Sequence, residues 1–205
     1  MIPKGAHMKY FLVISFIFLT GCVTASNQRS AHNHAISGQI AQENGNWDDA
    51  RKHWAKAVVN AQLADMNYKS LSIAYYEYGR SLGATCFFTE SEKYLNLALN
   101  IDKKRNGPAH MTILELARLH ASQSNLAKAV TYYEQLPAIY KERYYLEQRD
   151  PHGTGIVWEE YSEALRILGK NEQAEQYNQK AIVLKAKSSS SNSEITPYGK
   201  FCTNH

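Results

Sequence analysis

Small side chains recur at fixed spacing through most of this chain, and this repeat constrains the fold more than any other feature. Each of four rows starts with a small residue, has a second one twelve positions later and a third site seven positions after that. The rows are Gly38, Ala50, Ala57; Gly79, Ser91, Ala98; Ala117, Ala129, Leu136; and Ser162, Ala174, Ala181. Two antiparallel helices approach closely only where side chains are small, so the rows predict four helical hairpins.

The spacing between rows indicates connectors of variable length. The first residues of successive rows lie 79 − 38 = 41, 117 − 79 = 38 and 162 − 117 = 45 positions apart. Large residues flank the small ones at matched positions and are expected to fill the seams between hairpins. They are Trp54, Leu95 and Tyr133 after the second site, and Tyr75, Ile113 and Trp158 before the first. No sustained apolar–polar alternation supports a β-sheet, so the expected fold class is all-α.

Local signals agree with helices at these places. Asp48 and Asp49 follow Asn46 at a helix start, where a cap and negative charge are favourable. Residues 89–92 have the form of a capping box, and Gly107-Pro108 breaks the chain between the second and third rows. We expect helices near residues 31–44, 47–64, 68–84, 90–104, 109–122, 125–147, 154–168 and 171–187.

The register of these residues resembles the tetratricopeptide repeat (TPR). The matching positions are Trp158, Tyr161, Ser162, Leu165, Ala174 and Ala181 in the fourth row and Gly38, Ala50, Trp54 and Ala57 in the first. The period differs from the 34 residues of that family, and its end-of-repeat proline is absent at the expected positions. The resemblance covers residues 31–187 and implies an α-solenoid of about four TPR-like hairpins.

The N-terminus has the pattern of a secretory signal peptide. Lys9 precedes about ten apolar residues, and Leu19-Thr20-Gly21-Cys22 closes the stretch. This ending resembles the lipobox of bacterial lipoproteins, which implies lipidation of Cys22, cleavage before it and anchoring through fatty acids such as palmitate. The alternative is a buried helix or plain anchor helix that ends in cysteine. Either Met1 or Met8 serves as the start.

These features divide the chain into four expected segments: a cleaved lipoprotein signal peptide (1–21), a flexible tether (22–30), the TPR-like domain (31–187) and a flexible serine-rich tail (188–205). No run of 18 apolar residues follows the N-terminus, which argues against a multi-span membrane protein. In lipoproteins of two-membrane bacteria, an aspartate after the lipidated cysteine commonly retains the protein at the inner membrane. Val23 therefore favours the outer membrane, facing the periplasm.

Charge and motif content exclude several classes of function. The net charge is 23 − 19 = +4, and +2 without Lys4 and Lys9, which leaves no footprint for nucleic acid. Neither a nucleophile elbow nor a phosphate-binding loop occurs. The eight histidines lack metal-ligand spacing, and the glutamate pairs are typical of solvated helix surfaces. We expect no catalytic residues, no metal and no cofactor.

Cys86 and Cys202 remain after lipidation of Cys22, and an even count suits an oxidising compartment. A disulfide between them would close a loop of more than a hundred residues and bring the tail back along a face of the solenoid. A buried Cys86 with an unpaired tail thiol is the alternative, and the sequence leaves both open.

The TPR resemblance also implies a ligand-binding surface on the first helix of each hairpin. Carried onto this register, the ligand-binding residues are Gln39, Tyr76, Arg80, Arg118, Ser122 and Glu163. Arg80 and Arg118 recur at one position of adjacent repeats, so they are expected to clamp a carboxylate, with Tyr76 adding apolar area. The alternative is that these residues are ordinary surface charges.

The expected function is a lipid-anchored, periplasm-facing scaffold or adaptor that binds a protein or peptide in its concave groove. By resemblance, such a scaffold would act in the assembly of an envelope, secretion or pilus complex. Two other classes stay open: a structural subunit that uses its convex face and tail, and a cell-envelope enzyme with a site between repeats.

Overall fold

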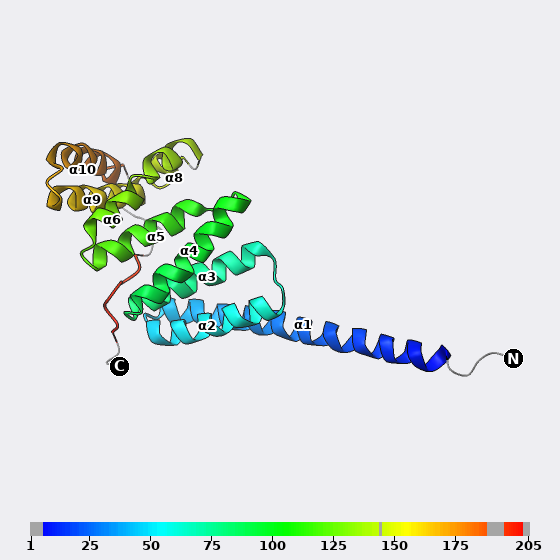
Figure 1. Cartoon of the computed structure of the whole chain (residues 1–205). Coiled ribbons are helices and arrows are strands. Elements are labelled where there is room, and N and C mark those ends of the chain that lie inside the picture. Colours follow the sequence, from blue (N-terminus) through cyan, green and yellow to red (C-terminus); the bar gives the residue numbers. More distant parts are fainter. Residues whose placement is uncertain (1–5, 144, 188–194, 203–205) are drawn as a thin grey trace.

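The computed structural model describes residues 6–143, 145–187 and 195–202, and every regular element in these ranges is helical. The elements are α1 (Ala6–Glu43), α2 (Trp47–Leu63), α3 (Tyr68–Ala84), α4 (Phe88–Arg105), α5 (Ala109–Ser122), α6 (Leu126–Tyr133), α7 (Leu136–Ala138), the π-helical η1 (Ile139–Arg143), α8 (Leu146–Arg149), α9 (Pro151–Ile167) and α10 (Asn171–Lys185). Antiparallel pairs stack one after another, and the first half of α1 projects from the stack as a single rod (Figure 1).

The predicted all-α solenoid of four hairpins is confirmed. The hairpins are α1–α2, α3–α4, α5–α6 and α9–α10, and the two helices of each pair contact each other. All twelve positions of the small-residue rows are buried. The largest apolar cluster runs from α4 to α10 and contains Leu95, Leu116 and Trp158, while a smaller one around Ala50 and Trp54 joins α1 to α2.

The two glycines of the rows lie where a neighbouring helix leaves no room for a side chain. A Cβ atom at Gly38 would lie 2.7 Å from Nε1 of Trp54, and one at Gly79 would lie 2.8 Å from Cγ of Leu95. Trp54 is also held by a hydrogen bond of 3.2 Å from its indole nitrogen to Gln42. The large residues four positions after the second site therefore pack directly on the glycines.

Serine in the rows serves the same packing through hydrogen bonds. The Ser91 hydroxyl donates to the carbonyl of Gly79 at 2.7 Å, and the Ser162 hydroxyl donates to the carbonyl of Ala174 at 2.8 Å. Each bond joins the first site of a row to its second site across the two helices. A buried hydroxyl needs such a partner, so serine replaces alanine here without an unpaired polar group.

Replacing Gly38 by alanine is expected to lower the free energy of unfolding by about 1–2 kcal/mol, because the added Cβ collides with the Trp54 ring and overpacking outweighs the gain in helix propensity. Urea unfolding followed by circular dichroism measures this change. Gln39→Ala, on the exposed side of the same helix, is the control and should change stability by less than about 0.5 kcal/mol. Equal stability of Gly38→Ala and the parent protein would contradict the close approach.

The turn inside each hairpin repeats as closely as the helices do. Gly45, Cys86, Ser124 and Gly169 each lie seven residues after the first site of their row, and all four have positive φ, between 59° and 76°. The residue after each donates a backbone hydrogen bond of 2.8–2.9 Å to the carbonyl five positions earlier. This left-handed ending satisfies carbonyls that the helix leaves free. The turn therefore fixes the position of Cys86.

The predicted helix over residues 125–147 is wrong in its second half. α6 ends at Tyr133, and α7, η1 and α8 follow as short separate pieces. Pro137 cannot donate a helical backbone bond, and Tyr145 has a φ of 50°, which no α-helix accommodates. α9 in turn begins at Pro151 rather than at 154, because Asp150 caps it by accepting from the Gly153 amide at 2.9 Å.

Residues 22–30, expected to be a flexible tether, continue α1 as helix. Neither proline nor glycine occurs between residues 23 and 37, so nothing in the sequence ends the helix there. Within the described parts of the chain, no helix combines the length and the apolar character needed to cross a membrane.

The C-terminal segment, residues 195–202, is packed against the solenoid, so the expectation of a flexible tail is wrong for these residues. Thr196 is 3% exposed, and the segment lies beside α3 and α5 (Figure 1). Polar side chains hold this segment in place, and helical periodicity in a sequence does not indicate contacts of this kind. Residues 188–194 and 203–205 of the expected tail lie outside the described residues.

Candidate binding groove

The first helices of the four hairpins, α1, α3, α5 and α9, lie on one face of the solenoid, which we call the groove. Polar side chains connect these helices along the groove. Gln42 of α1 donates to Glu77 of α3 at 3.0 Å. From there, charges of alternating sign continue through α3 and α5 to α9. We call these five residues the charge ladder: Glu77, Arg80, Glu115, Arg118 and Glu160.

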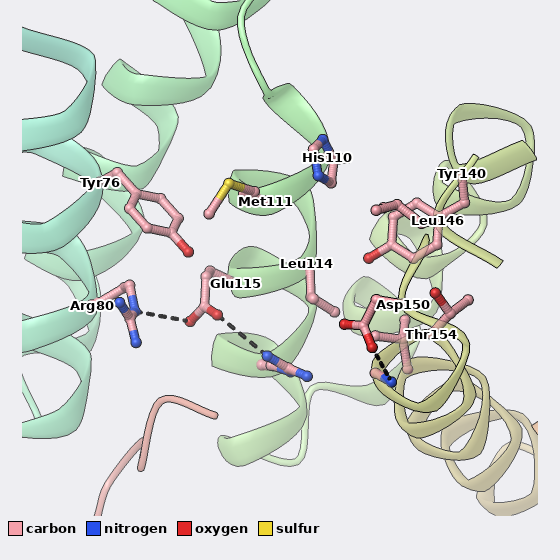
Figure 2. Close-up of a pocket in the computed structure, with 13 residues that line it drawn as sticks. Tyr76, Arg80, His110, Met111, Leu114, Glu115, Tyr140, Leu146, Asp150 and Thr154 are labelled. Carbon is pink, nitrogen blue, oxygen red and sulfur yellow. Dashed lines mark hydrogen bonds and ion pairs between the residues drawn. The ribbon is translucent and has the colours of Figure 1, made fainter. Parts of the chain in front are cut away.

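Each arginine of the charge ladder bridges two glutamates. Arg80 lies 2.9 Å from Glu77 and 3.9 Å from Glu115, and Arg118 lies 3.4 Å from Glu115 and 2.9 Å from Glu160. Both arginines are 8% exposed and Glu115 is 2% exposed. Figure 2 shows the guanidinium group of Arg80 beside Glu115, and Arg118 pairs with the same carboxylate. The ladder therefore ties three repeats together through one central carboxylate.

The electrostatics keep both arginines charged. Burial lowers the pKa of Arg80, but the charges of Glu115 and Glu77 outweigh it and raise that pKa above its usual value. Burial acts in the same way on Arg118, and Glu160 with Glu115 again raises the pKa. A buried guanidinium remains stable only with such partners, so the ladder depends on its glutamates.

The side chains of the C-terminal segment bind at the middle of the ladder. The Thr196 hydroxyl donates to Glu115 at 2.6 Å and accepts from Nε of Arg80 at 2.7 Å. The Tyr198 hydroxyl donates to the same Glu115 oxygen at 2.8 Å. Burial and the charge of Glu115 raise the pKa of Tyr198 well above its usual value, so this hydroxyl keeps its proton.

Backbone contacts with the end of α3 extend this interaction. The amide of Gly199 donates to the carbonyl of Gly83 at 3.1 Å, and the amide of Phe201 donates to the carbonyl of Ala84 at 3.0 Å. A Cβ atom at Gly83 would lie only 2.3 Å from the Tyr198 ring. Gly83 therefore forms the seat on which the tyrosine lies.

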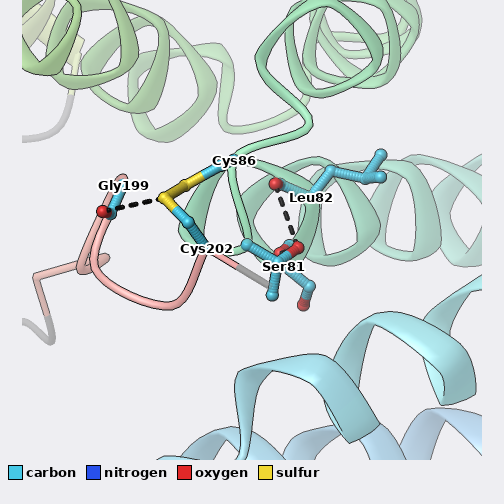
Figure 3. The surroundings of a disulfide bond; sticks show 6 residues. Ser81, Leu82, Cys86, Gly199 and Cys202 are labelled. Carbon is cyan, nitrogen blue, oxygen red and sulfur yellow. Dashed lines mark hydrogen bonds between the residues drawn. A yellow bond between two sulfur atoms is a disulfide. The ribbon is translucent and has the colours of Figure 1, made fainter. Parts of the chain in front are cut away.

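A disulfide between Cys86 and Cys202 closes the segment onto the solenoid (Figure 3). The two Cα atoms are 5.1 Å apart, and 116 positions of sequence separate the residues. Cys86 lies in the turn between α3 and α4, two residues after the second of the carbonyls that receive the tail amides. The bond thus holds the chain's end at the point where its backbone contacts finish.

Two cavities flank the C-terminal segment. One, of about 290 Å³, lies between α3, α5 and the start of α9 and is lined by Tyr76, Arg80, Glu115 and Arg118 among others (Figure 2). The other, of about 520 Å³, lies between α5, α9 and the segment itself. The segment supplies part of the wall of the second cavity, through residues 195–198 and Lys200.

The structure distributes the residues predicted to bind a ligand over three places. Tyr76, Arg80 and Arg118 line the first cavity, while Ser122 and Glu163 line the second together with Arg118. Gln39 is exposed on α1 and bonds to Glu43 of its own helix at 2.9 Å. Glu163 is exposed and pairs with Arg166.

The expectation that Arg80 and Arg118 face an open groove as a carboxylate clamp is wrong. Three glutamates of the chain already hold their guanidinium groups, and Thr196 covers Arg80. A double replacement by alanine therefore removes structural contacts rather than only a ligand contact. Removing one partner of a buried ion pair leaves the other charge buried without compensation, which is strongly destabilising.

The three glutamates of the charge ladder were not predicted, although the sequence contains a spacing that points to them. Glu77, Glu115 and Glu160 each stand two residues before the first site of their row, and Arg80 and Arg118 stand one residue after it. A recurrent Glu-x-x-Arg spacing places both charges on one face of a helix. Nothing in the sequence indicated that Thr196 or Tyr198 would join them, because this contact spans most of the chain.

The site offers little for metal or cofactor binding. In the described part of the chain, no group of three His, Cys, Asp or Glu side chains is arranged to hold a metal ion. Two histidines, His34 and His53, approach to 3.3 Å between their Nδ1 atoms, but they lie on α1 and α2, away from the ladder.

Comparison with known proteins identifies the fold. The chain matches BtubC (BKLC) from P. vanneervenii with a TM-score of 0.71 and 15% identity over 80% of this chain, and it spans 66% of the length of that protein. It matches the nearly identical TPR-like repeats of a Podosopora anserina protein described as a kinesin light chain with a TM-score of 0.59 and 21% identity, covering 78% of this chain and 76% of the other.

MamA gives a TM-score of 0.59 and 17% identity, with 91% of this chain and 97% of that chain covered. No protein-family model and no curated protein sequence matches the chain. The stacked hairpins, their buried small-residue rows and these structural matches agree, so the chain has the fold of the TPR-like helical-repeat proteins.

Proposed function

We propose that this chain is a protein-interaction scaffold whose groove binds an extended segment of a partner protein. The observation that carries the proposal is the C-terminal segment, which lies in the groove as a non-helical stretch held by Arg80, Glu115 and two backbone carbonyls of α3. The groove therefore accommodates an extended peptide and offers it both specific and backbone contacts. TPR-like solenoids present such surfaces along their inner helices.

The chemistry of the groove suits binding rather than catalysis. The buried charges of Arg80, Glu115 and Arg118 are paired with one another, and Glu77 and Glu160 complete the pairs. Proton transfer and nucleophilic attack need a group that is poised to change its charge or to attack, whereas these groups are engaged in structural pairs. We infer a non-enzymatic role on this basis.

We further propose that the scaffold is anchored by lipid on Cys22 and faces the periplasm from the outer membrane, as an adaptor in an envelope, secretion or pilus complex. Two features support this location. The lipobox-like ending at Cys22 suits a lipid anchor, and a disulfide such as Cys86–Cys202 forms in oxidising compartments and is rare in reducing ones. The helix over residues 23–30 would hold the folded body about 12 Å from the lipidated residue, at 1.5 Å per residue.

Site-specific photo-crosslinking in cells tests the scaffold function. A photo-reactive amino acid at Ser122 or Glu163, both exposed at the second cavity, is expected to give one discrete adduct with a partner protein. The same photo-reactive amino acid in place of Lys93 of α4 or Lys180 of α10 should not give that adduct, because both positions are exposed on the second helices of their hairpins. Adducts from Lys93 or Lys180 alone would instead favour a structural subunit that uses its convex face.

The same experiment tests the anchor. Cys22→Ser in the Ser122 background should remove the protein from the membrane fraction and reduce the adduct to the membrane-bound partner. Mass spectrometry of the parent protein should find an acylated N-terminal cysteine at residue 22. A mature chain that keeps residues 1–21 and carries no fatty acid contradicts the proposed location.

A further inference from the structure

The three glutamates of the charge ladder differ in where their additional hydrogen bonds come from. Glu77 accepts from Gln42, and Glu160 accepts from Tyr133 at 3.3 Å, so the solenoid itself supplies both donors. Glu115, the most buried of the three, accepts instead from Thr196 and Tyr198 of the C-terminal segment. The middle of the ladder is therefore completed by a part of the chain that is not part of any hairpin.

The contacts at Glu115 show which chemical groups the groove holds in this chain. The hydroxyl of Thr196 both donates to Glu115 and accepts from Arg80, so a side chain that only donates or only accepts does not replace it. Two residues on, the Tyr198 ring lies on Gly83 while its hydroxyl reaches the same carboxylate. The remaining bonds, from the amides of Gly199 and Phe201, do not depend on side-chain identity.

We propose that the segment Ile195–Phe201 is an internal ligand, and that the groove takes a partner segment of the same chemistry: an extended peptide with a threonine or serine followed two residues later by a tyrosine. This inference rests on the proposed scaffold function and specifies its partner. The charge of the ladder supports the choice, since two arginines and three glutamates sum to 2 − 3 = −1. A net negative site selects hydrogen-bond donors over carboxylates.

The disulfide makes this internal ligand a covalently held competitor. While Cys86 and Cys202 are bonded, the segment stays tethered beside the groove, and its effective concentration there is on the order of millimolar, above that of an ordinary partner in solution. A dithiol reductant opens the bond: one of its thiolates attacks a disulfide sulfur and releases one cysteine as a thiolate. The second thiolate then attacks the reductant's own sulfur in the mixed disulfide and releases the other cysteine. The reductant becomes a disulfide, and Cys86 and Cys202 gain two electrons and two protons as thiols. The exposed side chain of Cys202 gives the reductant access.

Fluorescence anisotropy with a labelled peptide of residues 195–201 tests this inference. The protein is the full chain with Cys86→Ser, Cys202→Ser, Thr196→Ala and Tyr198→Ala. These substitutions remove the disulfide and the two side chains that bind the C-terminal segment to Glu115, but they leave the groove residues intact. This variant is expected to bind the peptide saturably. The oxidised parent chain is expected to bind it at least ten-fold more weakly, because its groove is filled.

Two controls make the result specific. A probe with Thr196→Val and Tyr198→Phe lacks only the two hydroxyls and should bind at least ten-fold more weakly than the parent probe. Gly83→Ala in the four-substitution variant places a Cβ where the tyrosine ring lies and should abolish binding, with helicity by circular dichroism unchanged. Equal binding of both probes, or equal binding by the oxidised parent chain, would overturn the inference.

The outcome is separable from that of the scaffold proposal. If groove positions crosslink a partner in cells but the parent probe does not bind the four-substitution variant, the internal-ligand inference fails and the scaffold function stands. If the probe binds as expected but no partner adduct forms from the groove, the recognition chemistry stands and the scaffold function fails.

Discussion

Replacing Glu115 by alanine is expected to lower the free energy of unfolding by about 3–5 kcal/mol, the largest effect that we predict for a single side chain in the charge ladder. The substitution leaves Arg80 and Arg118, both 8% exposed, without their shared carboxylate. It also removes the acceptor of two hydroxyls of the C-terminal segment. Urea unfolding followed by circular dichroism measures the change.

A matched control exists on a neighbouring helix. Glu163 pairs with Arg166 at the same three-residue spacing as Glu115 with Arg118, but its side chain is 59% exposed. Exposed pairs of this kind contribute about 0–1 kcal/mol, so Glu163→Ala should change stability by no more than that. A similar, small loss for both variants would show that the ladder is not a buried ionic network.

Removing the disulfide is expected to lower the free energy of unfolding by up to about 5 kcal/mol. In the chain-entropy model, a cross-link that closes a loop of 116 positions restricts the unfolded chain by that amount. The appropriate protein is the double variant Cys86→Ser, Cys202→Ser, compared with the oxidised parent chain by urea unfolding.

The reduced parent chain serves as the control for the double variant. It keeps both cysteine side chains and lacks only the covalent bond, so its midpoint of unfolding should agree with that of the double variant. If the oxidised and reduced chains unfold at the same urea concentration, then the cross-link does not restrain the unfolded state, and the predicted stabilisation by the disulfide is wrong.

Features that repeat locally could be predicted from the sequence. Gly38 and Gly79 are small because Trp54 and Leu95 occupy the space beside them, and this relation holds within one hairpin, over sixteen residues. Such short-range constraints recur in each unit, so aligning the rows is enough to recover the solenoid. The positions of the four turn residues follow the same register.

Most features that depend on distant contacts could not be predicted, although the even cysteine count had offered the Cys86–Cys202 disulfide as one of two alternatives. The tail was expected to be flexible because residues 188–205 have no helical periodicity. Thr196 is nevertheless held by Arg80, which lies 116 positions earlier in the chain, and by Glu115, which lies 81 positions earlier. The arginines were expected to be free because a single helix does not reveal which residues the next helix brings against it. Glu115 and Glu160 reach them only after the hairpins stack.

The central claim is that the chain's own C-terminal segment occupies the groove, and hydrogen exchange tests it most directly. In the oxidised chain, the amides of Gly199 and Phe201 donate to carbonyls of α3, so both are expected to exchange far more slowly than an unstructured peptide of the same sequence. The account predicts that NMR on the full chain finds both amides protected from exchange. It also predicts that this protection is lost in the variant with Thr196→Ala, Tyr198→Ala and both cysteines replaced by serine. Exchange at the unstructured rate in the oxidised chain would contradict it.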